Sequence, residues 1–173
     1  MQETLVMTII GADRPGLVEL LSTCVTDHGG SWSESRLEIL DGQFAGLVRV
    51  RLPGERVESC LRALGALDSQ GLRVVAQPAR EVTDGQGMIV TLEVSGRDRP
   101  GIVHALAVVL AEHQANIRQF SSECLESTQG TAAIFQARAT IHVPAASSLA
   151  ALRHGIERVA AELPLEVRFL APD

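Results

Sequence analysis

The pattern of apolar and polar positions at the start of the chain predicts a strand followed by a helix. Strand-forming residues fill positions 4–10, and Gly11 ends this run. The next apolar side chains recur at the three- and four-residue spacing of a helix: Leu17, Leu20, Leu21, Cys24 and Val25. A Gly29-Gly30 pair then ends the helical pattern.

Two extended segments follow this helix. They cover residues 31–40 and 44–52, and the Asp41-Gly42 pair between them suits the positive φ angles of a tight hairpin turn. In the second segment apolar residues alternate with arginines, as expected for a strand with one buried face. A further apolar helical stripe begins at Val57, and a β-rich segment at 72–77 follows it. The predicted order of elements is therefore β-α-β-β-α-β.

The whole pattern occurs twice. The phrase GADRPGL at residues 11–17 returns as GRDRPGI at 96–102, 85 positions later, which indicates an internal duplication. The second copy is expected to contain strands at 88–94, 116–125, 132–143 and 165–170 and helices at 100–113 and 147–163. The offset grows to 91 between Pro53 and Pro144, so we expect additional residues in a loop at 126–131.

This duplication defines the fold class. We expect an α+β protein of two tandem ferredoxin-like βαββαβ units, each a four-stranded antiparallel sheet with two helices on one face. The predicted boundaries are 1–82 for the first domain, 83–87 for a polar, glycine-rich linker and 88–173 for the second domain. One sheet face of each unit is left to pair with the other unit or with a second chain, as in a homodimer.

Composition and charge narrow the function. The net charge of −6 disfavours direct nucleic-acid binding, which depends on basic groups. All 15 basic residues are Arg, so chemistry that needs a Schiff-base or phosphate-loop lysine is excluded. Residues 1–10 lack the features of a secretory signal, and the longest aliphatic run, 105–111, is far shorter than the ~20 residues of a membrane helix. We expect a cytoplasmic protein without membrane association.

The cysteines and histidines do not form a recognisable catalytic or metal-binding pattern. Cys24, Cys60 and Cys124 lie far apart among apolar residues with no C-x-x-C pair, which favours three small core residues. His28 and His113 come near equivalent helix ends, where helix capping is favoured over metal binding or catalysis. We therefore expect neither enzymatic activity nor a cofactor nor a metal.

The repeated turn itself has two interpretations. In the structural one, glycine permits unusual backbone angles, Asp13 or Asp98 caps the helix, and the proline opens its first turn. In the functional one, a strand-loop-helix junction presents backbone N–H groups and a positive helix end to a carboxylate, and a neighbouring acidic side chain holds an ammonium. The second interpretation describes a receptor for a free amino acid.

On these residues the chain resembles the ACT domain family of small βαββαβ regulatory modules. The resemblance rests on Asp13-Arg14-Pro15-Gly16 and Asp98-Arg99-Pro100-Gly101 after the first strand, on the segments 28–32 and 113–117 at the helix ends, and on the strand order. It covers both halves of the chain. A chain of two such units is most similar to the family of glycine cleavage system transcriptional repressors.

The resemblance implies where an effector would bind. In the ACT family effectors commonly lie between neighbouring modules, against the first strand-helix loop and the start of the second strand. For the second unit this implies the ligand-binding residues Gly96, Asp98, Arg99, Pro100, Gly101, Asn116 and Ile117. For the first unit it implies Gly11, Asp13, Gly16 and Ser31, with the serine in place of the asparagine and the bulky Trp32 beside it.

The family also implies a function. We expect a regulator that senses a small amino acid, for example glycine, and represses glycine cleavage genes through a DNA-binding protein partner. The alternative is a separate regulatory subunit that docks on an amino-acid biosynthetic enzyme and confers feedback control.

Overall fold

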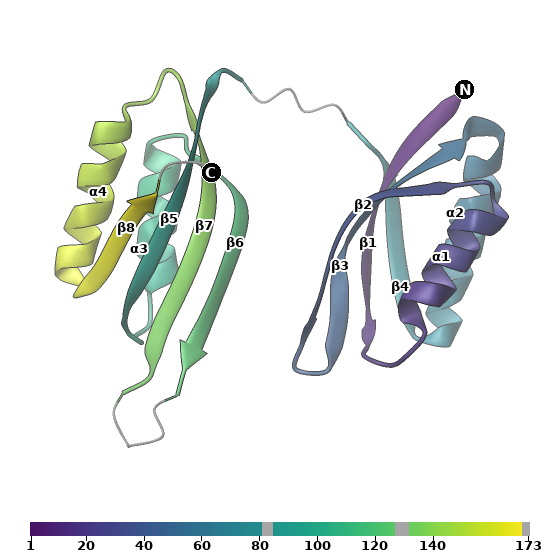
Figure 1. The fold of residues 1–173 in the computed structure, drawn as a ribbon, viewed down its shortest axis with the longest axis horizontal. Helices are drawn as coiled ribbons and strands as arrows, with labels where there is room; N and C mark the ends of the chain where they lie inside the picture. Colours follow the sequence, from purple (N-terminus) through teal and green to yellow (C-terminus); the bar gives the residue numbers. More distant parts are fainter. Residues whose placement is uncertain (81–84, 127–131, 171–173) are drawn as a thin grey trace. The chain divides into compact units, whose positions relative to one another are not determined.

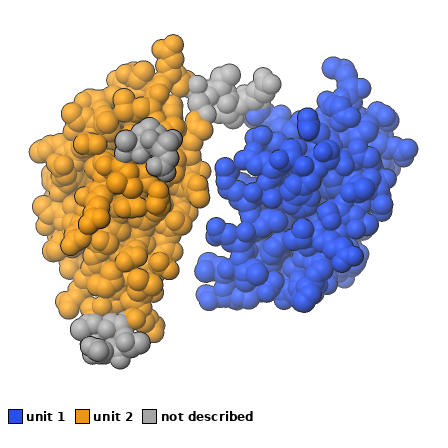
Figure 2. Space-filling view, in the orientation of Figure 1, with its two compact units in different colours: residues 1–82 blue, residues 83–173 orange. Residues whose placement is uncertain are grey.

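The computed structural model describes residues 1–80, 85–126 and 132–170, and the chain divides into two compact units, residues 1–82 and 83–173 (Figure 2). Unit 1 runs β1 (Gln2–Ala12), α1 (Leu17–Asp27), β2 (Ser31–Leu40), β3 (Gln43–Pro53), α2 (Val57–Ala66) and β4 (Leu72–Pro78). Unit 2 repeats this order as β5 (Gly87–Arg97), α3 (Ile102–Glu112), β6 (Asn116–Leu125), β7 (Ile134–Pro144), α4 (Leu149–Glu162) and β8 (Leu165–Leu170).

Each unit is an antiparallel sheet whose two helices cover one face (Figure 1). The strand orders are β2-β3-β1-β4 and β6-β7-β5-β8. All strand pairs are antiparallel, because each β-α-β crossover leaves room for a third strand that runs in the opposite direction between the two it connects. The expected pair of tandem ferredoxin-like βαββαβ units is confirmed.

Alternation along the central strands builds the two cores. In unit 1, Leu5, Met7 and Ile9 of β1 are fully buried, and β3 contributes Val48, Val50 and Leu52 from its inward face. In unit 2, five inward residues of β7 do the same: Phe135, Ala137, Ala139, Ile141 and Val143. Each unit thus has its own apolar core between its sheet and its helices.

The hairpin between β2 and β3 turns at the predicted dipeptide. Asp41 and Gly42 have φ angles of 47° and 75°, the left-handed pair that a two-residue turn between twisted strands requires. The corresponding loop of unit 2 was expected at 126–131, and its residues 127–131 lie outside the described part of the chain.

The predicted linker at residues 83–87 lies only partly within the described residues. Residues 83 and 84 of the predicted linker lie outside them, while Gly87 is already the first residue of β5.

Among the described helices, none is long and apolar enough to cross a membrane.

Both first helices begin after the proline of the repeated phrase, so the second one starts two residues later than predicted. Helices α1 and α3 start at Leu17 and Ile102, directly after Gly16 and Gly101 at their N-caps. The prediction that the proline opens the first helical turn is therefore wrong: it lies outside the helix. The left-handed glycine after it sets where helical geometry can begin.

Candidate functional site

The two strand-to-helix turns have almost the same backbone geometry. Gly16 has φ 91° and ψ −2°, and Gly101 has φ 93° and ψ −4°. A Cβ atom at either position would meet nothing within 4 Å, so the positive φ angle and not crowding requires glycine there. The space above both turns is open to solvent.

Glycine is required before these turns for a different reason, which is crowding. A Cβ at Gly11 would clash with the carbonyl oxygen of Gly71, and one at Gly96 would lie 2.7 Å from Leu165 Cδ2 and 3.0 Å from the Pro164 oxygen. These glycines let the start of the last strand pass close to the first strand. Gly11 and Gly96 therefore have a packing role that does not depend on a ligand.

The aspartates of the repeated phrase are tied to the neighbouring hairpin through their backbones. The Asp13 N–H donates to the Gly42 oxygen and the Asp98 N–H donates to the Ala133 oxygen, both at 2.8 Å. Among the described residues, no side chain caps α1 or α3, so the predicted capping by Asp13 or Asp98 is wrong. The first-turn amides of both helices are therefore not covered by an aspartate, and both carboxylates are exposed.

The side chains of the turns differ between the units. In unit 1, Arg14 Nη2 donates to the Gln70 oxygen at 2.8 Å and fastens the turn to the segment before β4. In unit 2, Asp98 lies beside Cys124 of β6, and desolvation together with the charge and hydrogen bond of this carboxylate raises the pKa of the Cys124 thiol. The Asp98 carboxylate therefore has a second polar group, the Cys124 thiol of β6, beside it.

The remaining predicted site residues lie at the opposite end of each sheet. Asn116 pairs through His142 with Ile89, seven residues before Gly96 along β5. At the rise of a strand this separates Asn116 and Ile117 from the turn of the same unit by about 23 Å. Ser31 is similarly remote from Gly11, because it pairs through Arg51 with Thr4. A single unit does not bring the two halves of the predicted site together.

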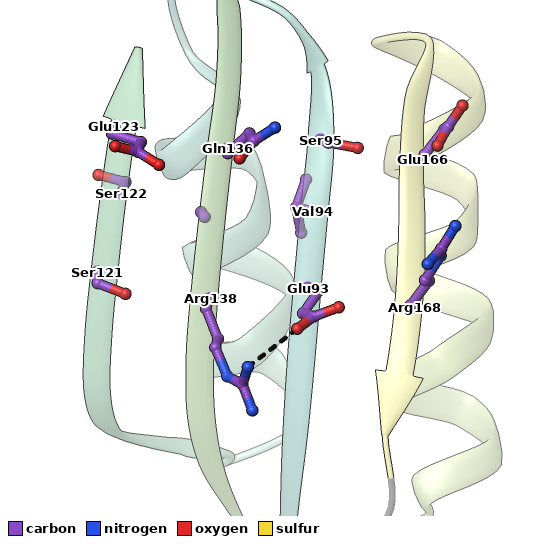
Figure 3. A pocket seen from close by; sticks show the side chains of 11 residues that line it. Glu93, Val94, Ser95, Ser121, Ser122, Glu123, Gln136, Arg138, Glu166 and Arg168 are labelled. Atoms are coloured by element: carbon purple, nitrogen blue, oxygen red, sulfur yellow. Dashed lines mark hydrogen bonds and ion pairs between the residues drawn. The ribbon is translucent and has the colours of Figure 1, made fainter. Parts of the chain in front are cut away.

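A pocket on the outer sheet face of unit 2 was not among the predicted site residues. Its volume is about 570 Å³, and it lies opposite the helices, with side chains from all four strands pointing into it (Figure 3). The polar lining residues are Glu93 and Ser95 of β5, Ser121, Ser122 and Glu123 of β6, Gln136 and Arg138 of β7, and Glu166 and Arg168 of β8. In the sequence, this face is indicated by the polar residues that alternate with the apolar core residues along each strand.

Both charge signs are present in this pocket. Arg138 Nη1 lies 3.2 Å from Glu93 Oε1, and Arg168 and Glu166 extend from the neighbouring strand β8 (Figure 3). The same face of unit 1 carries a smaller depression of about 100 Å³, where Glu34 pairs with Arg49 at 3.1 Å and Arg36 at 3.3 Å. A mixed-charge face of this kind suits a polar partner surface better than an apolar ligand.

The cysteines divide into one pair and one exposed thiol. Cys60 is buried, Cys24 is half-buried and Cys124 is exposed, so the prediction that all three are core residues is wrong for Cys124. The reason is that β6 is an edge strand whose residues are all exposed. Cys24, Cys60 and His28 lie together, with one ligand-type atom from each within 4.8 Å of the others.

The capping prediction for His28 agrees with its contacts. The His28 Nδ1 atom lies 2.7 Å from the Cys24 carbonyl oxygen in the last turn of α1. At the equivalent position of unit 2, the His113 carbonyl accepts a hydrogen bond from Ser147 Oγ at 2.8 Å.

These features define a class of protein, a pair of linked βαββαβ modules with matching glycine turns. Family models described as the ACT domain match residues 3–77 and 90–146, which together cover most of the chain. The chain belongs to the ACT domain family and contains two such domains in tandem.

Among individual relatives, the glycine cleavage system transcriptional repressors of Escherichia coli (strain K12) and Shigella flexneri are each 26% identical over 165 residues, covering 94% of this chain and 86% of theirs. A crystal structure of an unknown protein from Galdieria sulphuraria is 25% identical and superposes with a TM-score of 0.86 over the full length of both chains. The chain thus resembles the repressors along nearly its whole length.

Proposed function

We propose that this protein is an amino-acid-sensing regulator that acts on transcription through a protein partner. The observation that carries the proposal is the tandem ACT architecture together with similarity to the glycine cleavage repressors over 94% of the chain. The net charge of −6 argues against a DNA-binding surface on this chain, so repression needs a separate DNA-binding protein.

The effector of the proposal is a small amino acid bound at the turn of unit 2. The first-turn amides of α3 suit its carboxylate, and the exposed Asp98 carboxylate suits its ammonium group. The remaining turn residues that we assign to binding are Gly96, Arg99, Pro100 and Gly101. Unit 1 offers the same backbone, with Gly11, Asp13, Gly16 and Ser31 in the corresponding roles.

Asn116 and Ile117 can join this site only from another module. They lie about 23 Å from the turn of their own unit, a distance that no single amino acid spans. We therefore propose that a second copy of the chain supplies them in a homodimer, whose symmetry would build two equivalent sites.

Isothermal titration of the full chain with the twenty amino acids tests the effector. We expect saturable heat with one or a few small amino acids, glycine among them. Asp98→Ala should weaken binding about 10- to 100-fold, because it removes a charge-assisted hydrogen bond. Glu112→Ala, at the exposed far end of α3, is the matched control and should bind like the wild type. Flat traces with every amino acid would contradict the proposal.

Affinity purification from native cells, with and without the effector, tests the partner. Recovery of a DNA-binding regulator supports the transcriptional role. Recovery of a biosynthetic enzyme instead would identify a feedback-control subunit and refute the transcriptional part of the proposal.

A further inference from the structure

We propose that Cys24, His28 and Cys60 form a binding site for a thiophilic metal ion, represented by Zn²⁺, between α1 and α2 of unit 1. Two thiol sulfurs and one imidazole nitrogen lie within 4.8 Å of one another at this place. Thiolate and imidazole are the ligands that Zn²⁺ prefers in proteins. This inference does not depend on the amino-acid site, which lies in the turns at the other end of α1 and α3.

The two helices present the three side chains in a fixed arrangement. Cys24 and His28 are four residues apart and therefore lie on one face of α1 at its C-terminal end. Cys60 projects from the first half of α2, where it is fully buried against the core. Cys24 and His28 are only half-buried, so an ion can reach the cluster from solvent.

The imidazole is held in the orientation that a ligand needs. A carbonyl oxygen can only accept, so the 2.7 Å contact means that His28 Nδ1 carries the proton and donates it to the Cys24 oxygen. The lone pair of Nε2 is then available to a metal. A backbone carbonyl that receives the other N–H is the usual outer partner of a metal-binding histidine.

The ligand atoms fit a tetrahedral ion after a small movement. Zn–S and Zn–N bond lengths place tetrahedral ligand atoms about 3.5–3.8 Å apart, so the cluster must contract by about 1 Å. Binding replaces the two thiol protons, which pass to solvent, and leaves one coordination position for water. The half-exposed side of Cys24 and His28 is where that water would enter.

Unit 2 lacks these ligands at the equivalent place. His113 again ends the first helix, but Val109 stands at the position of Cys24, and helix α4 contains no cysteine. The Cβ that Gly155 would carry lies 2.7 Å from Val109 Cγ1 and 3.5 Å from His113 Nε2. In unit 2 the His113 Nε2 atom thus lies close to α4, and that helix offers no sulfur ligand.

Metal uptake by the reduced full chain tests the site. Titration with Co²⁺, a spectroscopic substitute for Zn²⁺, should give tetrahedral d–d bands and a thiolate-to-cobalt charge-transfer band that Zn²⁺ abolishes. His28→Ala and Cys24→Ser should each weaken binding by more than about 100-fold, because a lost ligand costs more than a lost outer partner. Cys124→Ser and His113→Ala are the matched controls and should bind like the wild type.

Thiol labelling of the unmodified chain gives a second readout that does not require a variant to fold. Zn²⁺ should slow the reaction of Cys24 with a maleimide reagent and leave the exposed Cys124 reactive, whereas Cys60 is fully buried and should stay unlabelled in both states. Three results would overturn the proposal: no Co²⁺ thiolate band, a band that survives His28→Ala and Cys24→Ser together, or equal labelling of Cys24 with and without Zn²⁺.

Discussion

Single glycines control the backbone of the repeated turns. Gly16 and Gly101 have left-handed φ angles near 90° with open space around the missing side chain. The two copies of the turn therefore share a left-handed backbone angle. A substitution at either glycine destabilises the fold because other residues are strained at that angle.

Gly101→Ala should lower the free energy of unfolding of unit 2 by about 1–2 kcal/mol, because alanine is strained at a positive φ angle. Gly65→Ala is the matched control, since Gly65 lies inside α2 with nothing within 4 Å of its missing Cβ. It should be neutral or stabilise by up to about 1 kcal/mol. Urea denaturation measures both variants, and equal effects at the two positions would refute the argument.

The raised pKa of the Cys60 thiol makes the free energy of unfolding fall as the pH becomes alkaline. Burial, and then the neighbouring Cys24, raises the pKa of Cys60 from 9.0 to about 11. The folded state therefore holds this proton more tightly than the unfolded state. The associated stability is fully present below pH 9 and is lost as pH rises through about 11.

Between those values the free energy of unfolding of the reduced, metal-free chain should fall by at most about 1.4 kcal/mol per pH unit from this group. Cys60→Ala should flatten the profile, although it lowers stability at neutral pH through the smaller side chain. Denaturant melts from pH 8 to 11 supply the comparison. A variant profile parallel to that of the wild type would exclude Cys60 as the cause.

At the scale of elements, α4 is the only one of the described α-helices whose N-terminus is capped by a side chain. Ser148 Oγ accepts a hydrogen bond from the Ala151 N–H at 3.2 Å. Ser148→Ala should therefore destabilise unit 2 by about 1 kcal/mol. Ser22→Ala serves as the control, because the Ser22 hydroxyl only donates to the Glu19 carbonyl within α1 and its loss should cost less than about 0.5 kcal/mol. Thermal unfolding of the two variants would contradict this account if Ser22→Ala were the more damaging.

Most elements could be predicted from the sequence because the hydrophobic period changes clearly between strand and helix. The spans 31–40, 116–125 and 165–170 were predicted with the bounds that the structure has. The start of α3 was placed too early, at Pro100, because proline suits a first helical turn but the glycine after it adopts a left-handed angle.

The candidate sites were predictable only in part. The duplicated phrase locates both turns, but sequence alone does not reveal that Asn116 lies at the far end of its own sheet. The thiol cluster was missed for a similar reason. Cys60 comes 36 positions after Cys24, and only the packing of α2 beside α1 brings the two sulfurs together.

At the scale of the whole molecule, each unit has its own closed core. The buried residues of unit 1 and unit 2 form two separate clusters, so we propose that residues 1–82 and 88–173 fold independently. Leu64→Ala, at a position only 1% exposed, should destabilise unit 1 by about 2–4 kcal/mol and leave amide exchange in unit 2 unchanged. Ile156→Ala, in the core of unit 2, should give the reverse pattern. Loss of protection in both units from either substitution would refute independent folding.

The central claim is that the turn of unit 2 receives a small amino acid. Its most direct test is an NMR titration of the ¹⁵N-labelled full chain with glycine and other small amino acids. We predict saturable shift changes at the amides of Asp98, Arg99, Gly101 and Asn116, and their loss in Asp98→Ala. Spectra that do not change at millimolar amino acid, or changes confined to the outer sheet face around Glu93 and Arg138, would contradict the claim.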